Sequence, residues 1–206
     1  MADINVLLVE GTDDKHVFYS LLKHYSIPEI IKVKDKAGIE NIIQTLDVEL
    51  DASGLENLGI VVDADIDIKA RWDSIRNRLI KCGYTSVPLE PDAEGTIILE
   101  DQKPRVGVWV MPDNKIPGML EHFVEFLIPE TDVLWGYAQS CVDSILNDQR
   151  PFGGDHIQKA YVHTWLAWRE KPGVPFGTAI TARYLNADAI HATRLIAWLR
   201  NLYNVS

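Results

Sequence analysis

The sequence predicts an α/β fold in which helices flank a mainly parallel sheet, and three observations support this. Short apolar segments typical of buried strands alternate with amphipathic segments typical of helices through the first half of the chain. This alternation requires crossover connections, which are right-handed in parallel sheets. Three apolar segments also end on or beside a carboxylate, namely Glu10, Asp63 and Asp113. This pattern places acidic groups at the carboxyl edge of the sheet, where open α/β sheets bind ligands.

The expected elements follow from hydrophobic periodicity and turn residues. Strands are expected near residues 4–9, 30–35, 58–63, 85–90, 96–100 and 106–111. Helices are expected near residues 13–25, 38–49, 69–82, 117–127, 131–148, 155–169 and 188–203. Residues 85–111 contain several prolines and glycines and therefore read as a hairpin of two short strands.

The helix expected at 69–82 has two distinct faces. Its apolar stripe against the sheet is Trp72, Ile75, Leu79 and Cys82. Its other face carries Lys69, Arg71, Arg76, Arg78 and Lys81. These cations either guide a nucleic-acid strand or form an ordinary solvated helix surface.

Length and composition limit the class of protein. The 206 residues suit one domain over 1–206, with a core over about 1–127 and a helical, tryptophan-rich C-terminal part over about 128–206. No apolar run approaches the ~18–20 residues that span a bilayer, so we expect no membrane association. The N-terminal residues lack the basic region of a secretion signal. Cys82 and Cys141 have no CxxC partner, which predicts free buried thiols and a cytoplasmic location.

The net charge of −10 argues against a histone-like or repressor-like role. Neutralisation of phosphates supplies most non-specific affinity for DNA, and an acidic chain lacks it. A metal-dependent nuclease remains compatible, because bound metal makes its carboxylates attractive to phosphate.

Carboxylates gather after the first and third expected strands. Glu10 directly follows the apolar strand and has no capping role there, which favours a metal or catalytic role. Asp13 suits the helix cap or first turn, whereas Asp14 is placed to reach the same space as Glu10. If the chain stays extended after its strand, Asp63 and Asp65 point the same way and can share a cation. Asp67 is either a further site residue or the N-cap of the next helix.

Further candidates are each weighed against an ordinary structural role. Asp113, Asn114 and Lys115 either form a turn or line the same sheet edge. Glu121 and Lys159 are either solvated helix residues or members of the site, where a lysine would stabilise charge on a phosphorane. The histidines are treated as structural. Walker, GxGxxG and GxSxG motifs are absent, which argues against those nucleotide cradles and against a serine hydrolase.

Several of these motifs together resemble the TOPRIM (topoisomerase–primase) fold. They are most similar to a small bacterial TOPRIM-like family allied to the TOPRIM half of OLD (overcoming lysogenisation defect) nucleases. The matching pieces are Val9-Glu10-Gly11 with Asp14, Asp63-Ala64-Asp65, Met111-Pro112-Asp113-Asn114-Lys115-Ile116-Pro117-Gly118-Met119-Leu120-Glu121, and the C-terminal helices around Lys159, Ala167-Trp168 and Gly177-Thr178-Ala179-Ile180. The ATPase half of the long OLD proteins has no counterpart here.

The resemblance implies a TOPRIM, Rossmann-like core with a helical C-terminal extension. It also implies Mg²⁺ (or Mn²⁺) at Glu10, Asp63 and Asp65, with Asp14, Glu121 and Lys159 as weaker candidates. We therefore expect Mg²⁺-dependent phosphoryl transfer on DNA or RNA, with Glu10, Asp63, Asp65 and Lys159 as catalytic residues. The activity expected is that of a nuclease.

Two other functions remain open. One is a non-catalytic module that binds metal or nucleotide and acts through a protein partner such as a separate ATPase. The tryptophan-rich helices then form a homodimer interface or pack on their own core. The other is a phosphatase with Asp63 as nucleophile and Asp65 as acid, which would form an aspartyl-phosphate.

Overall fold

Five strands form one sheet in the order β2-β1-β3-β5-β4. The computed structural model describes residues 4–205. The strands are β1 (Asn5–Val9), β2 (Ile31–Asp35), β3 (Asn57–Asp63), β4 (Thr96–Ile98) and β5 (Arg105–Met111). All pairs are parallel except β4 with β5. The predicted α/β class with a mainly parallel sheet is therefore confirmed.

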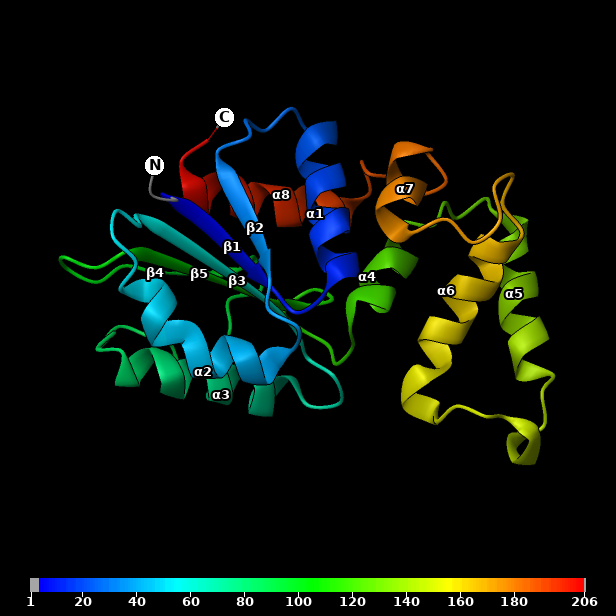
Figure 1. Ribbon diagram of the computed structural model, residues 1–206. Coiled ribbons are helices and arrows are strands. Elements are labelled where there is room, and N and C mark those ends of the chain that lie inside the picture. The colour runs from blue at the N-terminus through cyan, green and yellow to red at the C-terminus, as the bar shows by residue number, and fades with distance from the viewer. Residues whose placement is uncertain (1–3, 206) are drawn as a thin grey trace.

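The order of the strands creates a switch point between β1 and β3. The chain moves from β1 to β2 in one direction and then returns past β1 to β3. Because both crossovers follow a right-handed sense, their helices fall on opposite faces of the sheet. Helix α1 (Thr12–His24) lies on one face, and α2 (Ile39–Leu50) and α3 (Ile68–Lys81) lie on the other (Figure 1). A crevice forms where such connections diverge, outside the carboxyl ends of the strands.

Alternating side chains supply both faces of the central strands with a core. Val6 and Leu8 of β1 pack toward α2 and α3, whereas Leu7 and Val9 pack toward α1. The predicted apolar stripe of α3 is confirmed at Trp72, Ile75 and Leu79, which are fully buried. Its last member, Cys82, is only half-buried.

The C-terminal helix α8 (Ile190–Tyr203) returns to the sheet and completes the α1 face. It lies on a flat site made by Gly59 of β3 and Gly107 of β5, which are register partners. A Cβ at Gly107 would lie 2.6 Å from Leu202 Cδ2, so only glycine permits this close approach. The buried Tyr203 hydroxyl donates a hydrogen bond of 2.7 Å to the Val6 carbonyl. The last helix of the chain is thus joined to the first strand.

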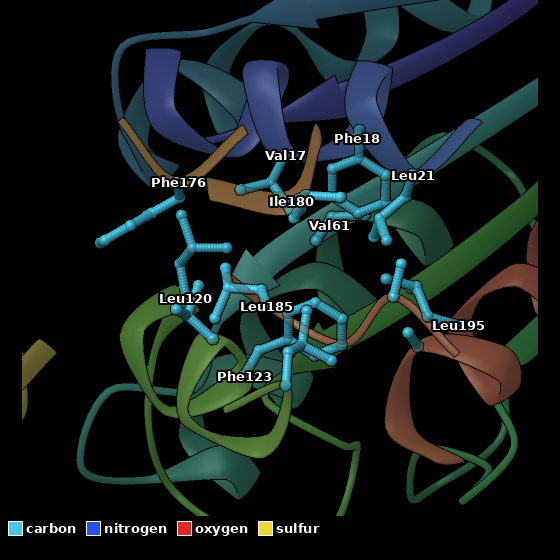
Figure 2. Close-up of a cluster of buried hydrophobic side chains, with 14 of the residues drawn as sticks. Val17, Phe18, Leu21, Val61, Leu120, Phe123, Phe176, Ile180, Leu185 and Leu195 are labelled. Carbon is cyan, nitrogen blue, oxygen red and sulfur yellow. The ribbon is translucent and has the colours of Figure 1, made fainter. Parts of the chain in front are cut away.

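Four shorter helices follow the last strand along the chain. They are α4 (Leu120–Phe126), α5 (Val133–Asp143), α6 (Ile157–Ala167) and α7 (Phe176–Thr181). Helices α5 and α6 pack side by side and project beyond α4, away from the sheet (Figure 1). Figure 2 shows how α1, α4, α7 and α8 share one cluster of apolar side chains with Val61 of β3. This cluster fixes α4 relative to α1 and the sheet.

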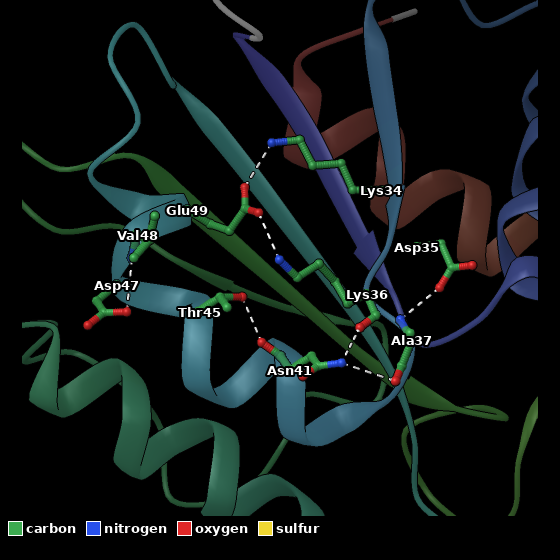
Figure 3. Close-up of polar contacts among 9 residues, drawn as sticks. All are labelled: Lys34, Asp35, Lys36, Ala37, Asn41, Thr45, Asp47, Val48 and Glu49. Carbon is green, nitrogen blue, oxygen red and sulfur yellow. Dashed lines mark hydrogen bonds and ion pairs between the residues drawn. The ribbon is translucent and has the colours of Figure 1, made fainter.

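The edge strand β2 is held to α2 by charge. Lys34 and Lys36 donate hydrogen bonds of 2.9 and 3.0 Å to the two carboxylate oxygens of Glu49 (Figure 3). These groups are partly buried, so the pairing is screened less than a surface ion pair. It joins the edge strand to the helix that follows it in the chain.

Several sequence expectations are corrected by the structure. The strand expected at 85–90 does not form, because Pro88 and Pro91 lack the N–H groups that a ladder needs. The Pro88 carbonyl instead accepts hydrogen bonds from Trp72 Nε1 and Arg76 Nε. The helix expected at 131–148 ends at Asp143, and the short helix α7 was not expected.

The cysteines and tryptophans of the chain differ in burial. Cys82 and Cys141 are both free, but the expected burial of Cys141 is wrong, because it is exposed on α5. Trp165 and Trp198 are buried in the chain's own core, whereas Trp168 is exposed. Among the described helices, none has the length and apolar character needed to cross a membrane.

Candidate functional site

Glu10 and Asp63 meet at the switch point between β1 and β3. Asp63 is the last residue of β3, and Glu10 directly follows β1. The backbone N–H of Asp63 donates a hydrogen bond of 2.8 Å to Glu10 Oε1. The Glu10 side chain thus continues the pairing of the two strands beyond the end of their ladder. The predicted meeting of these two residues at the carboxyl edge is observed.

The Asp63 carboxylate is oriented by the start of α4. The backbone N–H of Leu120 donates a hydrogen bond of 3.0 Å to Asp63 Oδ1. The packing of α4 in the apolar cluster of Figure 2 fixes the position of this N–H group. One Asp63 oxygen is therefore fixed by the backbone.

Two further carboxylates, Asp14 and Glu121, are buried nearby. Asp14 lies in the first turn of α1 and Glu121 in the first turn of α4, with exposed fractions of 8% and 5%. The Lys159 ammonium on α6 lies 3.3 Å from Glu121 Oε1. Of the alternatives for Glu121, a solvated helix face is excluded by this burial. Lys159 is half-exposed and reaches the cluster from the projecting helix pair.

The buried carboxylates oppose one another's ionisation. Burial raises the pKa of Asp63 well above its usual value, and the charges of Asp14, Glu10 and Glu121 raise it further. Burial, followed by the Glu10 and Glu121 charges, raises the pKa of Asp14 to about 7. Burial also raises the pKa of Glu10, although the hydrogen bond from Asp63 opposes this effect. The other carboxylates of the cluster therefore oppose the ionisation of Asp63 and Asp14.

Asp65 departs from the geometry expected for it. Its φ of 53° turns the chain immediately after β3, so the assumption of an extended segment from Asp63 to Asp65 is wrong. The Asp67 N–H closes the turn with a hydrogen bond of 3.3 Å to the Ala64 carbonyl, and the Asp65 N–H donates one of 2.8 Å to the Gly118 carbonyl of another loop. The Asp65 carboxylate instead pairs with Arg71 of α3. Asp65 is close enough for its charge to raise the pKa of Asp63, after larger contributions from burial and the other carboxylates.

Asp67 is the N-cap of α3. Its carboxylate accepts a hydrogen bond of 3.0 Å from Ala70 N–H, which satisfies one free donor of the first turn. Of the two roles considered for Asp67, the structure supports the cap.

The contacts of Asp113 and Asn114 are those of a turn. Asp113 Oδ1 accepts hydrogen bonds from the Lys115 and Ile116 N–H groups, and Asn114 Oδ1 accepts one from Val110 N–H. Both side chains are buried, whereas Lys115 is exposed. This segment closes the carboxyl end of β5, and turn chemistry accounts for its composition.

Arg71 is the residue at the site that sequence reasoning missed. It was placed with the cations on the solvent face of its helix, but its guanidinium turns back to Asp65. A long side chain in the first turns of a helix points toward the helix N-terminus. The position of Arg71, one turn after the cap Asp67, therefore indicates a side chain that points back toward the site.

A family model described as "Protein of unknown function (DUF3226)" matches residues 4–204. The chain belongs to the DUF3226 family. The match extends from β1 to α8 and includes all the site residues named above. No curated protein and no solved structure matched the chain.

The donors at this DUF3226 site fit a hard divalent cation in chemical type. Mg²⁺ and Mn²⁺ prefer carboxylate oxygens as ligands, and every acidic side chain of the site offers them. Across residues 4–205, however, no group of three or more His, Cys, Asp or Glu side chains is arranged to hold a metal ion. Glu10, Asp63, Asp65 and Glu121 each have one carboxylate oxygen in a hydrogen bond or ion pair described above. Side-chain rotation would be needed for these groups to converge on one ion.

The electrostatics predict how stability of the DUF3226 chain depends on pH. The pKa of Asp14 is about 7 in the folded protein and about 4 in an unfolded chain. Between these values the folded state holds more protons, so the free energy of unfolding falls as pH rises. Without metal, we expect the ionisation of Asp14 to lower the free energy of unfolding by about 2–4 kcal/mol between pH 4 and pH 7.5. Urea unfolding with EDTA should show a weaker decline for Asp14→Asn, and parallel curves would contradict the assignment.

Proposed function

We propose that the protein is a divalent-metal-dependent phosphoryl-transfer enzyme that hydrolyses nucleic acid. One observation carries the proposal: Glu10, Asp14, Asp63 and Glu121 are brought together at the switch point of a parallel sheet, where they repel one another. An arrangement that opposes folding in this way is typical of functional sites. A divalent cation would relieve the repulsion.

Glu10, Asp63 and Asp65 would hold the cation, with Asp14 and Glu121 as further oxygen donors. When bound, Mg²⁺ or Mn²⁺ supplies an acidified water and neutralises charge on a phosphate. The chain positions these groups through its backbone, because the Leu120 N–H fixes Asp63 and the Asp63 N–H fixes Glu10.

The charges of two further side chains would assist the reaction. Burial and the Glu10 and Glu121 charges raise the pKa of Asp14 to about 7, and a bound cation would favour its ionised, ligating form. Lys159 brings a positive charge to Glu121 from a separate helix, and this charge would stabilise negative charge that develops on a phosphate.

The resemblance to TOPRIM proteins and OLD nucleases supports the same proposal. It rests on the strand-ending Glu10 and Asp63-x-Asp65, together with Glu121 and Lys159, which the fold brings to one edge. A cytoplasmic location is part of the proposal, because both cysteines are free. DNA or RNA is the proposed substrate.

A second function is favoured by the charge state of α3. Lys69, Arg71 and Arg78 of its basic face pair with Asp73, Asp65 and Asp47 of the same chain. The pairing of three of its five cations reduces the charge that this face offers to phosphates. The alternative is therefore a metal- or nucleotide-binding module that acts through a partner, such as an ATPase or a second copy of the chain.

Cleavage assays over a metal titration test the proposal. Supercoiled plasmid and labelled single-stranded DNA and RNA would be incubated with the protein and increasing Mg²⁺ or Mn²⁺. We expect metal-dependent cleavage that falls on the order of a thousandfold in Glu10→Gln. The exposed Glu130→Gln, which makes the same chemical change away from the site, should leave cleavage unchanged. Metal binding without cleavage of any substrate would favour the binding module.

A further inference from the structure

Arg71 occupies an unusual position for a basic residue near the start of an exposed helix. Its side chain is only 14% exposed, whereas the Asp65 carboxylate that it contacts is 51% exposed. Its Nε is buried and has no hydrogen-bond partner in the part of the chain that the structure describes. The guanidinium therefore gives up hydration to lie against the acidic site.

The charge of Arg71 acts on more than one carboxylate of the site. Besides its contact with Asp65, the guanidinium is near enough to attract the Glu10 carboxylate. The guanidinium therefore serves Asp65 through direct contact and Glu10 through its field. On the α6 side of the site, Lys159 makes the corresponding contact with Glu121.

A divalent cation and this guanidinium compete for the same negative charge. Both are attracted to Asp65, and two positive groups repel one another at close range. While Arg71 pairs with Oδ2 of Asp65, this carboxylate has less negative charge to offer to a metal ion.

We propose that Arg71 is a built-in counter-ion of the site, which Mg²⁺ or Mn²⁺ displaces from Asp65 on binding. This inference rests on the metal site of the proposed function and adds a regulatory property to it. Arg71 stabilises the acidic cluster when metal is scarce and weakens its affinity for metal. Filling the site then requires a higher free metal concentration than it would with the carboxylates alone.

Calorimetric titration with Mn²⁺ at one fixed pH tests this role. In Arg71→Gln the competitor is removed, and we expect Mn²⁺ to bind about tenfold more tightly, since a close opposite charge shifts a carboxylate's proton equilibrium by one to three powers of ten. Arg71→Lys keeps the charge and should stay near the wild type. Lys69→Gln is the matched control, because Lys69 lies on the same turn of α3 but pairs with Asp73. Its affinity should change less than twofold.

The outcomes separate this inference from the proposed function. Tight Mn²⁺ binding by Arg71→Gln, with weak or undetected binding by the wild type, supports the counter-ion role. Equal or weaker binding by a folded Arg71→Gln, with clear wild-type binding, overturns the role but leaves the metal site intact. Absence of binding in all variants overturns both. Circular dichroism and the thermal midpoint with EDTA establish folding, and Mn²⁺ should raise the midpoint of Arg71→Gln more than that of the wild type.

Discussion

Asp63→Asn is expected to abolish metal-dependent cleavage and, at the same time, to make the metal-free protein more stable. Burial and four neighbouring carboxylates raise the pKa of Asp63, so its ionisation opposes folding at neutral pH. Asparagine removes the charge, and its Oδ1 can still accept the hydrogen bond from Leu120 N–H. We expect a gain of about 1–3 kcal/mol at pH 8 and a loss of cleavage on the order of a thousandfold.

The pH dependence of this gain has a definite direction. An unfolded aspartate ionises near pH 4, and the folded Asp63 ionises at higher pH, so the wild type loses stability as pH rises above about 4. The advantage of Asp63→Asn should therefore grow from pH 4 to pH 8, as measured by urea unfolding in EDTA. Asp67→Asn is the control, because asparagine caps a helix as well as aspartate does. A less stable Asp63→Asn at pH 8 would show that the folded protein stabilises the Asp63 carboxylate.

Gly59→Ala is expected to give a large loss of stability, because α8 lies directly on this residue. A Cβ at this position would lie 2.5 Å from both Leu7 Cδ1 and the Tyr203 hydroxyl. The strand cannot move away without breaking its ladder, so Tyr203 must shift and weaken its buried hydrogen bond to Val6. Overpacking together with this hydrogen bond predicts a decrease of about 2–4 kcal/mol in the free energy of unfolding.

Gly136→Ala provides a control with the opposite sign. Gly136 lies inside α5, and nothing lies within 4 Å of the position of its Cβ. Alanine is a better helix former than glycine, so this change should stabilise the protein by about 0.5–1 kcal/mol. Urea unfolding of both variants measures the difference. A Gly59→Ala protein as stable as the wild type would mean that α8 is held only loosely on the sheet.

The sequence predicted the sheet edge well because local rules determine it. Apolar strands followed by Glu10 and Asp63 require parallel crossovers, and parallel strands bring their carboxyl ends together. Trp72, Ile75 and Leu79 reveal their helix face by spacing alone. These features depend on residues that are close in sequence.

The misses have two causes, one local and one tertiary. Asp65, the partner of Arg71, is only six residues away, but helix periodicity separates an apolar face from a polar one and does not identify a partner in the preceding loop. The left-handed turn at Asp65 depends on the hydrogen bond to Gly118, a residue from a different loop. The burial of Glu121 depends on the packing of α4 in the cluster of Figure 2. Tertiary structure therefore decides the turn at Asp65 and the burial of Glu121.

The pairing of β1 with α8 also has a consequence for how the chain folds during synthesis. Val6 and Tyr203 are 197 positions apart, yet the Tyr203 hydroxyl binds the Val6 carbonyl at the centre of the sheet. A nascent chain that has already formed β1, β3 and β5 still exposes an apolar sheet face until α8 has emerged. Contacts that span so much of a chain slow folding, because the connecting loop must close first. We therefore expect the native state to form only after residues 190–203 have left the ribosome, with chaperones covering the open face until then.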